Sequence, residues 1–161
     1  MTSQKTHDPA SAVNELRAAV EGFSRFIREL PEADQAEKAW GPREVLAHLV
    51  FWIESYVAQV ESLLSGEPPE LPQGRFSDLN VQAVEASRGV PVGELLRRFR
   101  AADERLRHFG RTLDPQRILL EVHWRRGTWL CTLDDVIAKI RTHVHRHHRE
   151  LARQGTDSSV S

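Results

Sequence analysis

Hydrophobic residues recur at steps of three and four along most of this chain, which is the spacing of helices that bury one face. One such stripe covers residues 10–30, and a second covers 42–66, where a Gly-Pro pair suits the first turn of a helix. Two further stripes cover 91–110 and 133–154. The pattern therefore predicts four long helices.

The segments between these stripes differ in character. The stretch GEPPELPQGRFSD after the second stripe is rich in Pro and Gly and long enough to cross the molecule, and a short helix is predicted at 77–87. Residues 111–131 are ambiguous: ILLEVHW is compatible with a short strand or a helical turn, and the following Arg-Arg-Gly indicates a turn. Strand signals are otherwise almost absent. The predicted fold class is all-α, a four-helix bundle with a long crossover connection between helices 2 and 3.

Length and composition set the outer limits. At 161 residues, 18.4 kDa and 40% hydrophobic residues, we expect a single domain over 9–154 with flexible termini at 1–8 and 155–161. The one cysteine, Cys131, excludes an intrachain disulfide and a Cys-rich zinc site. No apolar run is long enough for a membrane span, and the polar start lacks the apolar core of a signal peptide. A cytoplasmic protein with no membrane partner is expected.

The charge is unevenly distributed although the net charge is −1. Residues 1–96 carry 8 basic and 15 acidic side chains, whereas 97–154 carry 14 basic and 7 acidic ones. Such an asymmetry is compatible with an anionic partner such as nucleic acid. In a helical bundle, however, the two halves of the chain pack together, and no groove-reading or aromatic-basic motif accompanies the charge. Nucleic-acid binding is therefore an unfavoured alternative.

The histidines are concentrated near the C-terminal end of the chain, where four of the eight fall within positions 143–148. At about 100° per residue, His143 and His147 share the face of the apolar residue Val136 in the last predicted helix. His145 points away from that face, and His148 lies to its side. A Thr-Leu-Asp-Asp sequence at 132–135 resembles a capping box that begins this helix.

A third histidine, His48, lies on the apolar stripe of the second predicted helix. Two imidazoles at i and i+4 can converge on one metal ion, and three neutral imidazoles with open positions form a catalytic type of site. The alternative interpretations are a buried structural His48 and a solvated cationic end of the last helix. Glu44, one turn before His48, and Glu121 would be able to orient a ligand or act as a base, but surface carboxylates are the simpler interpretation. The remaining histidines (His7, His108 and His123) are interpreted as surface or loop residues.

Three segments resemble the DinB-like superfamily, and in particular its ClbS/DfsB-type four-helix bundle proteins. They are WGPREVLAHLVFW at 40–52, with the family's tryptophan and Leu-Ala-His, the stretch at 76–106 with an Asn-x-x-x-Val pattern, and IRTHVHRHHREL at 140–151, which is similar to the terminal His-x-x-x-His. Together they span most of residues 10–154.

The resemblance implies a function as well as a fold. In the superfamily the matching histidines hold a divalent metal, often zinc or nickel, so the implied ligands are His48, His143 and His147, with His148 as the fallback for His147. Some relatives use a low-molecular-weight thiol, and others protect against reactive small molecules. We therefore expect a metal-dependent hydrolase or a thiol-dependent transferase acting on a small electrophile. A metal-free small-molecule binding protein is the alternative, and a homodimer is plausible.

Overall fold

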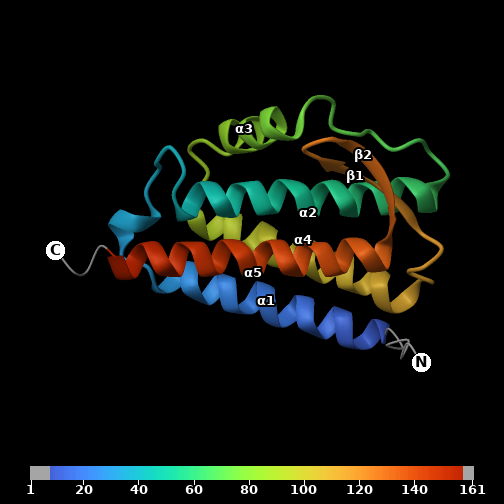
Figure 1. Cartoon of the computed structure of the whole chain (residues 1–161), viewed down its shortest axis with the longest axis horizontal. Helices are drawn as coiled ribbons and strands as arrows, with labels where there is room; N and C mark the ends of the chain where they lie inside the picture. Colours follow the sequence, from blue (N-terminus) through green and yellow to red (C-terminus); the bar gives the residue numbers. More distant parts are fainter. Residues whose placement is uncertain (1–7, 158–161) are drawn as a thin grey trace.

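Four long helices lie side by side in the computed structural model, which describes residues 8–157 apart from the side chains of Trp124, Thr156 and Asp157 (Figure 1). They follow the predicted stripes closely: α1 (Pro9–Glu29), α2 (Pro42–Ser65), α4 (Val92–Thr112) and α5 (Leu133–Asp157). A short helix, α3 (Phe76–Ala86), and a 3-10 turn, η1 (Glu32–Gln35), belong to the connections. None of the helices in the described part is long and apolar enough to cross a membrane.

Two helix starts show why the sequence begins them where it does. The Asp8 carboxylate accepts a hydrogen bond from the Ala10 amide (3.1 Å) at the start of α1, and the Thr132 hydroxyl accepts one from the Asp135 amide (3.1 Å) at the start of α5. Asp8 is the N-cap of α1, and α5 continues to Asp157. Residues 1–7 and 158–161 lie outside the described residues.

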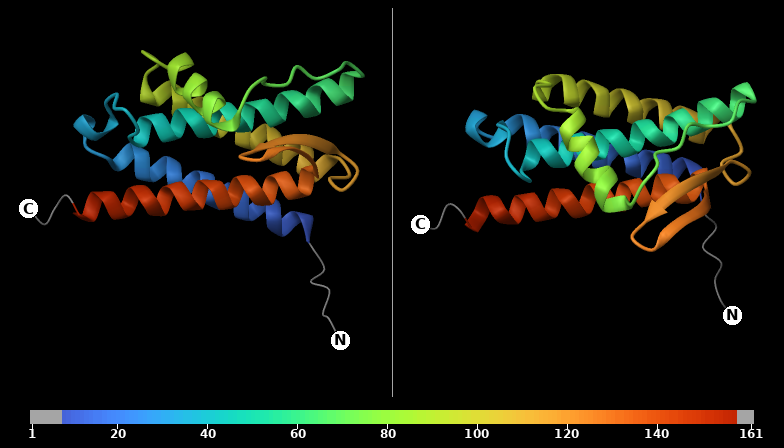
Figure 2. Two further views of the ribbon diagram at one scale, coloured as in Figure 1. Left: turned by 45° about the horizontal axis from the view of Figure 1, so that its top comes forward. Right: turned by 90° about the horizontal axis from the view of Figure 1, so that it is seen from above.

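The connections determine which helices run in the same direction. Helix α2 packs closely against α4, α4 against α1, and α1 against α5. Because α2 and α4 run in the same direction, the chain must return between them. The connection after α2 does so by running back along that helix to α3 (Figure 2). The predicted long crossover between the second and third long helices is therefore present.

The structure corrects the expectation of an all-α fold. The ambiguous segment contains two antiparallel strands, β1 (Leu119–Trp124) and β2 (Gly127–Thr132), which form a hairpin closed by Arg125 and Arg126. The turn requires Gly127, whose φ of 138° is strained for residues with a side chain. The described chain is thus mostly helical with a small two-stranded sheet. Leu120 and Val122 face inward, so the strand completes a core that the helices leave uncovered.

Packing between the long helices is uneven. At Gly110 of α4, an added Cβ would lie 2.8 Å from a methyl carbon of Ile137 and 3.0 Å from one of Val13, so α4 approaches both α1 and α5 closely there. By contrast, α2 and α5 have few direct contacts with each other. The hairpin lies beside α2 and α5, on the sparsely packed side (Figures 1 and 2).

Candidate metal centre and adjoining pocket

The three predicted histidines lie together between α2 and α5. His48, on α2, is almost fully buried (2% exposed), and its Nε2 atom lies 3.1 Å from Nε2 of His143 on α5. One turn further along α5, Nε2 of His147 lies 2.9 Å from the same His143 atom. The structure thus brings together two side chains that are 95 residues apart in the sequence.

The spacing of these nitrogen atoms fits a metal ion better than it fits hydrogen bonds. A neutral imidazole nitrogen has one proton or one lone pair to offer, so Nε2 of His143 cannot hydrogen-bond well to both neighbours. Two nitrogens that each lie about 2.05 Å from a metal are separated by roughly 2.9 Å at a right angle and roughly 3.3 Å at a tetrahedral angle. The observed 2.9 and 3.1 Å fall at or within these limits, and all three ligand atoms lie within 4.8 Å of one another.

The electrostatic environment keeps the three imidazoles neutral at physiological pH. Burial, with smaller contributions from the neighbouring histidines, lowers the pKa of His48 to about 4 and that of His143 to about 2. Burial also lowers the pKa of His147, as does the charge of Arg146, while Glu150 acts in the opposite direction. Neutral imidazole is the form that binds metals, so the site needs no proton release before binding.

Glu150 positions one of these ligands. Its Oε2 atom lies 3.3 Å from Nδ1 of His147, so an Nδ1–H of this ring can donate to the carboxylate and leave Nε2 for the metal. Sequence analysis did not single out Glu150, although the i+3 spacing from His147 was available as a signal. The described part of the chain thus supplies three nitrogen ligands and one carboxylate, that of Glu150, which orients a ligand without contacting the ion.

The other α5 histidines are directed elsewhere. His145 is exposed, as its helical phase predicts. The ring of His148 packs against Phe23 and Phe26, with centroid distances of 5.9 and 4.9 Å, so this fallback residue is not part of the three-histidine cluster. The helical phase was therefore sufficient to separate the inward pair from its neighbours.

The start of α2 fixes the depth of His48. Contrary to the surface interpretation, Glu44 is buried (1% exposed), and its Oε1 atom accepts hydrogen bonds from the backbone amides of Gly41 (3.0 Å) and Lys38 (3.1 Å). Gly41 is the N-cap of α2 and Lys38 lies in the segment before it, so Glu44 caps the helix and fastens that segment, and it is not a base in the site. The half-exposed Trp40 places its ring 5.7 Å from that of His48 and shields it on this side.

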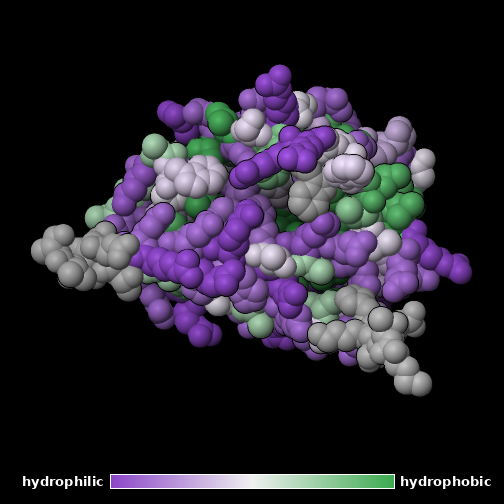
Figure 3. Space-filling view, in the orientation of Figure 1, coloured by the Kyte–Doolittle hydropathy of each residue, from purple (hydrophilic) through white to green (hydrophobic). Residues whose placement is uncertain are grey.

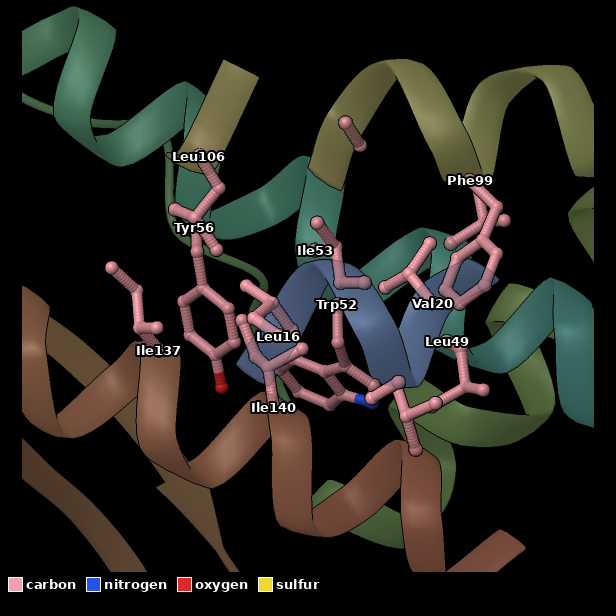
Figure 4. Close-up of a cluster of buried hydrophobic side chains, with 14 of the residues drawn as sticks. Leu16, Val20, Leu49, Trp52, Ile53, Tyr56, Phe99, Leu106, Ile137 and Ile140 are labelled. Carbon is pink, nitrogen blue, oxygen red and sulfur yellow. The ribbon is translucent and has the colours of Figure 1, made fainter. Parts of the chain in front are cut away.

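A pocket of about 850 Å³ adjoins the histidines between α2, α5 and the hairpin. Its walls are largely apolar, and Figure 4 shows Trp52 and Tyr56 of α2 facing Ile140 of α5 across this region. Of the three clustered histidines, only His143 lines the pocket. Figure 3 shows the face of the molecule that carries α5 and the hairpin. This face is largely hydrophilic, with hydrophobic surface visible in a hollow between the two.

The hairpin contributes His123 and Trp129 to the pocket. His123, interpreted as a surface or loop residue, is half-buried, packs its ring 5.7 Å from that of Trp52 and lines the pocket. Exposed Trp129 on β2 also lines it. No spacing in the sequence links these residues to α2, because the hairpin is placed by tertiary packing alone.

A helical protein with an inward three-histidine cluster beside an apolar pocket is the class defined by this fold and this site. The family model of the DinB superfamily matches residues 33–151, most of the chain. The protein therefore belongs to the DinB superfamily. No curated protein matches it significantly.

Solved structures agree with this assignment at the level of the fold. A crystal structure of a mycothiol-dependent maleylpyruvate isomerase superposes with a TM-score of 0.71 at 14% identity, covering 94% of this chain and 63% of the isomerase. The chain thus spans less than two thirds of that protein. An uncharacterised protein from Escherichia coli UTI89 gives a TM-score of 0.71 at 12% identity, covering 95% of this chain and 94% of the other. A protein from Streptococcus pneumoniae gives 0.68 at 12% identity, covering 91% and 93%.

Proposed function

We propose that this protein binds one divalent metal ion, zinc or nickel, through His48, His143 and His147, and acts on a small electrophilic molecule held in the adjoining pocket. The observation that carries the proposal is the convergence of three neutral Nε2 atoms beside an apolar pocket that His143 lines. When bound, a metal with three protein ligands and an open position lowers the pKa of a water or thiol there.

The protein's own groups have separate tasks in this proposal. The histidines hold the ion, and Glu150 keeps the ring of His147 oriented. The apolar walls, among them Trp52 and Ile140, exclude water from the reacting groups. Because His143 lines the pocket, a ligand can approach the open side of the ion from there. The similarity to a thiol-dependent isomerase supports a thiol as co-reactant, and hydrolysis by an activated water is the other form of the same proposal.

Metal content tests the first part of the proposal. Protein produced without a histidine tag, loaded with zinc or nickel and freed of excess ion, is expected to contain about one ion per chain. His48→Ala should remove most of it, whereas His145→Ala, which truncates an exposed histidine of the same helix, should leave it unchanged. Substoichiometric metal in the parent, or equal losses in both variants, would contradict the site.

Thiol consumption tests the second part. The loaded protein, the chelated protein and His48→Ala are each incubated with a low-molecular-weight thiol and a panel of small electrophiles, and free thiol and electrophile are followed. Only the loaded parent is expected to accelerate the loss of an electrophile, with or without the thiol. Acceleration that survives chelation would contradict the role of the metal.

A metal-free binding protein is the second candidate, and the size of the pocket favours it, since 850 Å³ is within the range of small-molecule sites. It predicts that a bound small molecule raises the melting temperature equally in chelated and metal-loaded protein. A thermal shift that requires the metal contradicts this candidate.

A further inference from the structure

The charged residues of the pocket are mainly of one sign. Among those that line it, Arg125, Arg126, Lys139 and Arg146 are basic, and Asp135 alone is acidic. The rest of the wall is dominated by aromatic and aliphatic side chains. A pocket with this composition attracts a negative group to its rim and buries an apolar body.

The positions of two of these cations relate them to the histidine cluster. Lys139 precedes His143 by four residues on α5, and Arg146 follows it by three. Side chains at these spacings lie on one face of a helix, about 5–6 Å apart at their Cβ atoms. A ligand whose reactive atom lies over His143 therefore has a cation about one helical turn away in either direction.

Arg146 is the better placed of the two to hold an anion. Its only recorded ion pair among the described residues is a loose one, 4.0 Å to Glu150, and both side chains are more than half exposed. Glu150 also lies 3.3 Å from His147, so it is shared between two partners. A guanidinium offers five donors in a planar fork that matches a carboxylate, sulfonate or phosphate.

We propose that the pocket selects small molecules with a flat apolar body and one anionic group, and that Arg146, assisted by Lys139, binds the anionic group next to the histidine cluster. The apolar body then lies between Trp52 and Trp129. Arg125 and Arg126 at the tip of the hairpin add to the positive potential at the entrance. The inference rests on the proposed function for the reacting end of the ligand, but the selection itself requires no metal.

Two probes of similar shape measure how much the negative charge of a ligand contributes to its binding. Naphthalene-2-sulfonate carries a flat apolar body with an anion that is a poor metal ligand, and its N,N-dimethylsulfonamide is neutral and similar in shape. Affinities are measured by calorimetry in chelated protein first, and then in zinc-loaded protein. In the chelated parent the sulfonate is expected to bind about tenfold more tightly, a difference of about 1.4 kcal/mol.

Two variants test whether Arg146 provides the preference for the anionic probe. Arg146→Gln should reduce the preference for the sulfonate to less than about threefold while leaving the affinity of the neutral probe unchanged, because it removes one charge-assisted contact. Arg149→Gln removes another exposed cation of α5 that does not line the pocket, and it should retain the full preference. Both substitutions are on the surface, and an unchanged melting temperature will verify that the fold is intact.

Two results would overturn the proposal. The first is equal affinity of the two probes for the chelated parent, and the second is an equal loss of preference in Arg146→Gln and Arg149→Gln. Failure of the metal centre gives a different result: the chain would retain no zinc, yet the sulfonate preference in chelated protein would persist. The two proposals can therefore fail independently.

Discussion

The two opposite sides of the helical core are built differently. Between α1 and α4 the interior is closed by large apolar side chains, such as Phe23 and Phe99, whose rings meet edge to face at a centroid distance of 5.8 Å. Between α2 and α5 the helices have few direct contacts, and the space holds the histidine cluster and the pocket. Side chains that fill space compactly stabilise a fold, whereas a ligand site needs unfilled space and polar groups. The difference indicates that stability and function can be changed separately.

The largest expected effect is on the closed side. Phe99→Ala removes a fully buried ring and leaves a cavity that rigid helices cannot fill, so the free energy of unfolding should fall by about 3–5 kcal/mol. Urea unfolding measures the loss. Phe26→Ala, which removes a ring of α1 that is only partly buried, should cost clearly less. In the protein that remains folded, zinc content per chain should equal that of the parent, and a selective loss of zinc would contradict the separation of the two sides.

The open side should respond to pH. Because burial holds the folded-state pKa of His48 near 4, below the usual 6.5, the unfolded chain takes up a proton first as the pH falls. The contribution of neutral His48 to the free energy of unfolding is fully present above pH 6.5 and is lost as the pH falls toward 4. In chelated protein, lowering the pH from 7 to 5 should cost about 2 kcal/mol from His48 alone.

Urea unfolding at the two pH values measures this effect. His48→Gln should show a smaller pH dependence than the parent, and His145→Gln, which changes an exposed residue outside the cluster, serves as the control. If the parent is equally stable at both pH values, the buried neutral histidines are not a property of the folded protein.

The two sides also differ in how far the sequence alone predicts them. Helical periodicity places the apolar face of each long helix, and the same geometry selects His143 and His147 over His145. These features depend on residues within one or two turns of each other, so a single sequence carries them. The burial of His48 was predictable for the same reason.

The hairpin and the pocket depend on packing between distant segments. Strand β1 has inward residues at alternate positions, but it is too short to be distinguished from a helical turn by periodicity. Two hydrogen bonds tie it to α2, because the side-chain amide of Gln59 donates to the Glu121 carbonyl (2.9 Å) and accepts from the Glu121 backbone amide (2.8 Å). Because the two residues are 62 positions apart, the spacing of residues within either segment does not predict their contact.

This pair of hydrogen bonds gives the third prediction. Gln59 is buried (4% exposed), so Gln59→Ala leaves two backbone groups of Glu121 without their partner and should cost about 1–2 kcal/mol. Gln59→Glu keeps an acceptor for the Glu121 amide but loses the donor. This variant is expected to be less stable than the parent mainly because the Glu121 carbonyl has lost its hydrogen-bond partner. Hydrogen exchange at the Glu121 amide should accelerate more in the first variant than in the second. Unaltered exchange in both would show that other contacts hold the hairpin.

The smallest effect on stability is expected at the outer wall of the pocket. Trp129 is 59% exposed, so Trp129→Ala should change the free energy of unfolding by no more than about 0.5 kcal/mol. The indole nevertheless lines the pocket and would be covered by a bound aromatic body, so the affinity for naphthalene-2-sulfonate should fall several-fold. Leu130→Ala provides the matched control, because its side chain is the next along β2, is more exposed (70%) and does not line the pocket. Calorimetry on the two variants should separate them. Equal affinities would place the ligand elsewhere on the open side, whereas a loss confined to Trp129→Ala would show binding that depends on a residue with almost no role in folding.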